Sequence, residues 1–150
     1  MNLTIKDFMK GKIDNVEDLV NLSDMIWEIG ELEEIKAKIN PELFTLHIMI
    51  NMIGNWQGDG WLGILHYQDK LIPYIPHALS ELEFHEIKNS FQEIISIYPN
   101  ISSFSKEERF FRDKLDVLED LSDLIWGCNA PSGGWGCVFD YLKKVDRQIL

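Results

Sequence analysis

The stretch of sequence that decides the fold is residues 40–53, which read N-P-E-L-F-T-L-H-I-M-I-N-M-I. Asn40 is a preferred N-cap residue, and Pro41 suits the first helical position because the N–H of that position has no partner within a helix. Apolar side chains then occupy nearly every side of the helix, and a helix without a polar face lies in the interior. The sequence therefore predicts a central apolar helix at about residues 41–53.

On either side of this segment, apolar residues recur at helical spacing, and no segment shows the two-residue alternation of a strand. Ser80 with Glu83, and Ser105 with Glu108, resemble capping boxes that start helices. The pattern predicts helices at about residues 16–29, 61–69, 84–98, 106–126 and from 133 onward. Gly30 either ends or kinks the first of these, because a helical period continues beyond it to residue 39. We expect an all-α protein, one domain over residues 1–150 that forms a bundle of about six to seven helices.

The charge of the chain is its unusual compositional property. With 25 acidic and 14 basic side chains in 150 residues, the formal net charge is -11. Because like charges repel, we expect neither a nucleic acid nor an anionic membrane as a direct partner. A basic protein is the expected partner. A plain contribution to solubility is the alternative. No segment resembles a signal peptide or a membrane span, and we expect a cytoplasmic protein in which Cys128 and Cys137 are reduced.

Acidic residues form two rows at alternating steps of three and four positions, with Asn21 filling the one gap in the first row, which places each row on one helix face. Along an α-helix such residues lie about 5 Å apart per turn, a spacing similar to that of phosphates along a nucleic acid strand. Neither row has a Lys or Arg beside it from residue 14 to 34 or from 116 to 141. We interpret both rows as candidate partner-binding faces, and solvated helix faces are the other interpretation. The first row is Asp14, Glu17, Asp24, Glu28 and Glu31, and the second is Asp113, Asp116, Asp120 and Asp123.

Two further segments echo each other: residues 55–61 read N-W-Q-G-D-G-W, and residues 129–135 read N-A-P-S-G-G-W. Each lies between two predicted helices, where glycine allows a positive φ, Asp or Ser caps the next helix, and Trp covers the apolar side. We predict structural joints at Asp59, Gly60, Trp61, Ser132, Gly134 and Trp135. An exposed aromatic anchor for a partner is the alternative. Residues 22–27 and 121–126 also echo each other, which leaves a duplication open.

The sequence contains no established catalytic or metal-binding motif. His47 and Asn51 are four residues apart on the central helix, where a hydrogen-bonded pair in the core is the first interpretation. The other histidines have no ligand spacing that we recognise, and Cys137 has no His nearby in the sequence. We therefore expect no catalytic residues, no metal and no cofactor.

Residues 51–98 resemble the acidic helical DNA-mimic proteins of bacteria. In that family a helix ends in an N-G-G-F or N-G-G-W turn, to which residues 58–61, G-D-G-W, correspond here with Gly-Asp-Gly in place of Asn-Gly-Gly. Ala78 and Leu79 match the A-L pair of the short helix that follows, and residues 83–99 match its long helix ending near a proline. The resemblance implies an acidic protein that occupies the DNA-binding surface of a basic partner, without catalytic residues.

These observations together predict a non-enzymatic acidic binding protein that inhibits a basic partner. A toxin as partner would make the chain an immunity protein, and a DNA-binding protein as partner would make it a DNA mimic. The alternative is a small-ligand-binding protein or enzyme with a pocket around His47, Asn51 and the Gly-Trp joints.

Overall fold

The computed structural model describes residues 2–97, 106–127 and 134–150. In these ranges the chain forms seven α-helices and no strand, apart from an isolated bridge between Leu3 and Ile39. The all-α prediction is confirmed. The helices are α1 (Val16–Trp27), α2 (Leu32–Lys38), α3 (Pro41–Tyr67), α4 (Ile75–Glu81), α5 (His85–Ile97), α6 (Lys106–Trp126) and α7 (Trp135–Ile149), with short 3-10 turns η1 (Ile5–Asp7) and η2 (Asp69–Tyr74).

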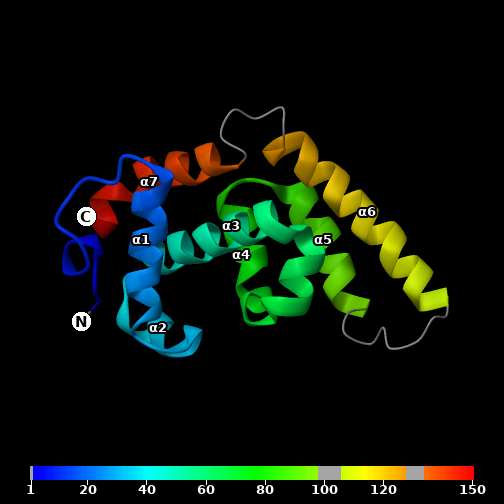
Figure 1. The fold of residues 1–150 in the computed structure, drawn as a ribbon, viewed down its shortest axis with the longest axis horizontal. Coiled ribbons are helices and arrows are strands. Elements are labelled where there is room, and N and C mark those ends of the chain that lie inside the picture. The colour runs from blue at the N-terminus through cyan, green and yellow to red at the C-terminus, as the bar shows by residue number, and fades with distance from the viewer. Residues whose placement is uncertain (1, 98–105, 128–133) are drawn as a thin grey trace.

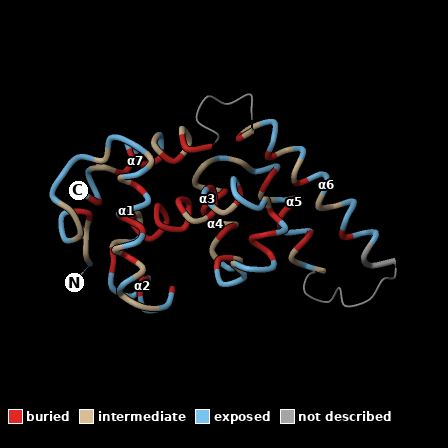
Figure 2. The backbone as a smooth tube through the Cα atoms, in the orientation of Figure 1, coloured by how far each residue is buried: buried red, intermediate tan, exposed pale blue. Residues whose placement is uncertain are grey.

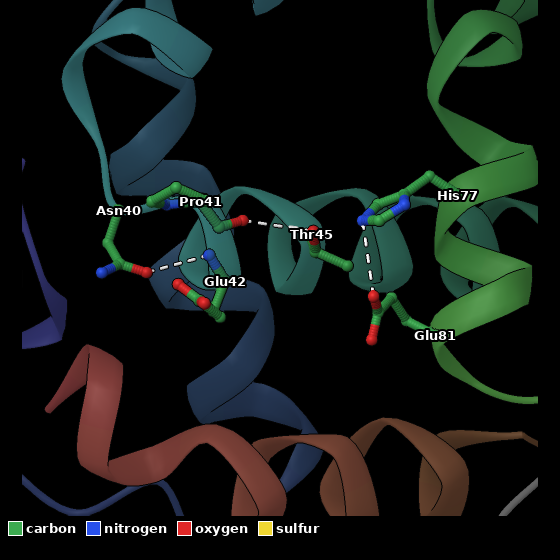
Figure 3. Close-up of polar contacts among 6 residues, drawn as sticks. All are labelled: Asn40, Pro41, Glu42, Thr45, His77 and Glu81. Atoms are coloured by element: carbon green, nitrogen blue, oxygen red, sulfur yellow. Dashed lines mark hydrogen bonds and ion pairs between the residues drawn. The ribbon is translucent and has the colours of Figure 1, made fainter.

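Helix α3 runs through the middle of the molecule and contacts α1, α2, α4, α6 and α7 (Figure 1). Its start is capped as predicted, because the Asn40 side chain accepts the backbone N–H of Glu42 at 2.9 Å (Figure 3). Nearly every residue from Leu43 to Ile53 is buried. The predicted central apolar helix is therefore confirmed.

The same helix continues beyond the predicted end. It runs to Tyr67 and is interrupted only at Gly60, whose φ of 69° and ψ of -171° are not helical. Glycine reaches this region because it has no Cβ. The helix predicted at residues 61–69 is thus the second half of α3, joined to the first half across a kink.

Gly30, with a φ of 145°, separates α1 from α2, so of the two outcomes expected there the structure has a break and not a kink. The capping box predicted at Ser80 is wrong, because Ser80 lies in the last turn of α4 and α5 begins only at His85, after Glu83 at a φ of 64°. Ser105 lies outside the described residues.

One hydrophobic core holds the described helices together. Buried apolar side chains from all seven α-helices belong to a single contiguous cluster. Figure 2 shows the first half of α3 as the most continuously buried segment, whereas α6 alternates between buried and exposed positions along its length. The exposed side of α6 lies at the edge of the molecule.

Candidate functional site

The first acidic row follows the outer side of α1. Glu17 and Asp24 lie within the helix, Asp14 precedes its N-cap, and Glu28 is its C-cap. All of these side chains and Glu31 are exposed. Glu31, at the start of α2, forms an ion pair with Lys70 at 3.0 Å. The first and last members of the row thus lie outside α1, and the last is partly neutralised.

The second acidic row lies on α6. Asp113, Asp116, Asp120 and Asp123 are all exposed, on the side of the helix opposite to the buried Leu118, Ser122 and Trp126. The second half of α6, after Lys114, has acidic but no basic side chains.

The structure does not bring the two rows together. Helix α1 packs against the first half of α3, where Ser23 contacts His47, and α6 packs against the kink, where Glu119 contacts Trp61. These two contacts are about 20 Å apart along α3. Figure 1 shows α1 and α6 at opposite ends of the long axis of the molecule. Each row is therefore a separate candidate surface.

Glu119 is a structurally important carboxylate that the sequence interpretation missed. Its Oε1 accepts the backbone N–H of Trp61 at 2.7 Å, and its Oε2 accepts the indole N–H of Trp56 at 3.3 Å. Burial raises the pKa of the Glu119 carboxyl, and these two donors oppose the rise. The helical pattern gave no signal for this role, because Glu119 lies three residues after Asp116 and four before Asp123, beside the exposed acidic row.

The two glycine-tryptophan joints meet at the same place in the fold. Gly60 and Gly134 have φ values of 69° and 95°. The Trp61 ring lies 5.9 Å from that of Trp126, and a Cβ on Gly134 would lie 3.2 Å from the Trp126 side chain. Asp59 is exposed, and the carboxylate that accepts from Trp61 is that of Glu119.

The second joint is described only in part, since Ser132 lies outside the described residues. Trp135 is buried, and its indole N–H donates to Gln57 on α3 at 2.7 Å.

His47 and Asn51 belong to a polar network between α1 and α3. Ser23 Oγ lies 2.9 Å from His47 Nδ1, and the Asn51 amide donates to Ser23 Oγ at 2.9 Å. The indole N–H of Trp27 donates to Asn51 Oδ1 at 3.0 Å. His47 is fully buried, its Nε2 has no hydrogen-bond partner in the described part of the chain, and burial lowers its pKa to about 4. The imidazole is therefore neutral at physiological pH and acts as a packed, polar part of the helix contact.

Two cavities on the surface of the described residues lie elsewhere. A cavity of about 600 Å³ opens between α2, α3 and α4, where Thr45 and His77 approach from opposite walls (Figure 3). Another, of about 930 Å³, lies between the N-terminal segment and α7. Neither is lined by His47 or Asn51. Among the described residues, no group of three or more His, Cys, Asp or Glu side chains has a metal-binding arrangement.

Cys137 is half-buried and has a free thiol, whereas Cys128 lies outside the described residues. None of the helices in the described ranges combines the length and the apolar composition needed to cross a membrane. Comparisons with protein-family models, curated proteins and solved structures find no match to this chain.

Proposed function

We propose that this protein is a non-enzymatic acidic binding protein that neutralises a basic partner protein. The observation that supports the proposal is the exposure of all nine carboxylates of the two acidic rows in a chain of net charge -11. The partner is a toxin or a DNA-binding protein, and in the second case the acidic rows take the place of the phosphates. The resemblance to acidic DNA-mimic proteins supports the same kind of partner.

The acidic rows act mainly on the rate of association. Complementary charge steers two proteins toward each other and raises the association rate constant, and salt screens this attraction with a Debye length of about 8 Å at physiological ionic strength. Because the rows are at opposite ends of the molecule, a partner of ordinary size contacts one row closely and feels the other only as a distant charge. The association rate should therefore depend more strongly on one row than on the other.

The experiment uses affinity capture from the native host to obtain the partner, and then stopped-flow measurement of the association rate at several salt concentrations. One variant reverses the α1 row, with Lys at Asp14, Glu17, Asp24 and Glu28, and another reverses Asp113, Asp116, Asp120 and Asp123. A matched control reverses four exposed carboxylates outside the rows, Glu34, Asp69, Glu86 and Asp140. All three variants have the same net charge, so a difference between them reports position.

We expect the association rate of the wild-type protein to fall steeply with salt. One of the two row variants should associate roughly tenfold or more slowly than wild type, and the control variant should be slowed less. If all three variants associate equally slowly, the rate depends on the net charge of the protein and not on the positions of the two rows. An association rate that neither salt nor the row variants change would contradict the proposal.

A further inference from the structure

Helix α6 has a stripe of exposed apolar side chains beside its acidic row. Phe110, Val117 and Leu124 are 49%, 51% and 70% exposed. They are seven residues apart, close to two helical turns, and so follow one line along the helix. The opposite side of α6 is occupied by its contacts with α3 and α5. The stripe therefore faces outward at the edge of the molecule that Figure 1 shows on the right.

The acidic row runs along one side of this stripe. Asp113 lies three residues after Phe110 and four before Val117, and Asp120 has the same relation to Val117 and Leu124, so each aspartate adjoins two stripe residues. Asp116 and Asp123 lie further round the helix. At the start of the stripe Lys114 Nζ lies 5.4 Å from the centroid of the Phe110 ring. Beyond Lys114 the result is an apolar line with a parallel line of negative charge and no basic side chain on α6.

The α1 row has no such companion. On α1, which lies wholly within the described residues, a single large apolar side chain, Val20, is exposed, at 38%. Leu19, Leu22 and Ile26 are fully buried. The exposed face of α1 is therefore mainly charged. The exposed face of α6 has both charged and apolar side chains, and burial of the apolar side chains against a partner would stabilise a complex.

We propose that the exposed face of α6 is the docking site for a basic amphipathic helix of the partner protein. This inference rests on the proposed function, because it assumes a basic partner. A helix with apolar residues at seven-residue spacing would pack along the stripe, and Lys or Arg on its flank would face the aspartates. A second copy of this chain fits poorly, since pairing two α6 faces would bring two acidic rows together.

The test uses a defined probe, a fluorescein-labelled synthetic peptide of leucine and lysine, about five helical turns long, with leucines on one helix face. A scrambled peptide of the same composition is the control for charge alone. Binding is measured by fluorescence anisotropy at about 0.15 M salt, where weak, distant charge attraction is screened. The backbone amides perturbed by the peptide are mapped by NMR on the isotope-labelled protein.

Two protein variants separate the apolar contribution from the charge contribution. Val117→Ser with Leu124→Ser shortens the stripe and leaves the charge unchanged, and Asp113→Lys with Asp120→Lys reverses the charge beside it. Val20→Ser and Asp24→Lys with Glu28→Lys are the matched changes on α1. All of these side chains are exposed, so the variants should fold, and circular dichroism and the melting temperature verify this.

We expect both α6 variants to weaken binding of the amphipathic peptide by roughly tenfold or more, and the α1 variants to change it less than threefold. The scrambled peptide should bind weakly, and the NMR changes should concentrate on residues 110–124. If charge reversal weakens binding but removal of the apolar side chains does not, the inference is overturned while the proposed function stands. If no reversal on either helix matters, both fall. If the wild-type protein sediments as a dimer and the Leu124→Ser protein as a monomer, the stripe binds a second copy of this chain and the inference is overturned.

Discussion

The carboxylate of Glu119 on α6 accepts the backbone N–H of Trp61, the first residue after the kink of α3, at 2.7 Å. Gly60 ends the first half of α3, so the N–H groups that begin the second half have no helical partner of their own. A carboxylate at this end also interacts favourably with the helix dipole. A side chain 58 positions away in the sequence thus acts as the N-cap of the second half of α3 and anchors α6 there.

Replacing Glu119 should destabilise the protein. Glu119→Ala leaves the backbone N–H of Trp61 and the indole N–H of Trp56 without their acceptor, at a cost of about 1 to 3 kcal/mol in the free energy of unfolding. Glu119→Gln keeps one acceptor oxygen and should cost less. Urea unfolding measures both, with the exposed neighbour Asp120→Ala as the control, which should stay within about 0.5 kcal/mol of wild type. A loss from Asp120→Ala equal to that from Glu119→Ala would contradict this role.

Two glycines of α3 should respond to alanine in opposite directions. Gly60→Ala forces a side chain into a φ of 69° and brings its Cβ to 2.9 Å from Glu119 Oε1, so we expect a loss of roughly 1 to 3 kcal/mol. Gly58 is helical, and a Cβ there would meet nothing within 4 Å. Gly58→Ala should therefore stabilise by about 0.4 to 1 kcal/mol. Thermal unfolding of the two variants checks the sign, and a stable Gly60→Ala protein would rule out the kink as described.

The buried His47 makes stability depend on pH. Its pKa is lowered to about 4 in the folded state, so between that value and the unfolded value of about 6.5 the unfolded chain binds more protons. Stability should therefore fall as the pH falls from 6.5 toward 4, by on the order of 3 kcal/mol from this group. Carboxylates also titrate near the lower end, so the informative quantity is the difference between wild type and His47→Gln. Parallel pH profiles for the two proteins would contradict the burial of a neutral imidazole.

Salt should stabilise the folded protein. Its net charge of -11 produces self-repulsion in the compact state. Raising sodium chloride from about 0.01 M to 0.15 M shortens the Debye length from about 30 Å to 8 Å and screens this repulsion. The urea midpoint should rise over that range, and potassium chloride should act alike. A falling midpoint would mean that attractive ion pairs outweigh the repulsion between carboxylates.

The part of the fold that follows from local sequence was predictable. Asn40 and Pro41 start α3 because capping involves only adjacent backbone groups. The all-round apolar pattern after them places that helix in the interior. The exposure of Glu17 and Asp24 on α1 and of the row on α6 likewise follows from helical periodicity, whereas Asp14 and Glu31 lie outside α1.

The remaining features depend on contacts between distant segments. The sequence showed a glycine at the kink but not that Glu119, rather than Asp59, would cap the helix after it. Ser80 resembles an N-cap, yet the left-handed Glu83 ends the connection between α4 and α5 three residues later. The difference between the two acidic rows also depends on tertiary structure, since only packing determines which apolar residues of α6 stay uncovered.

The arrangement of tryptophans gives this chain two separate optical reporters. The ring centroids of Trp56 and Trp61 lie 5.4 and 5.9 Å from that of Trp126, so the excited states of these rings interact and their emission depends on the contact of α3 with α6. Trp27 lies apart, against His47 on the contact of α1 with α3. A Trp27→Phe protein keeps Trp56, Trp61, Trp126 and Trp135, so its fluorescence would follow the contacts of α3 with α6 and α7. Its difference from wild type would follow the contact of α1 with α3. Whether the two ends unfold together can be read from the protein without any added label.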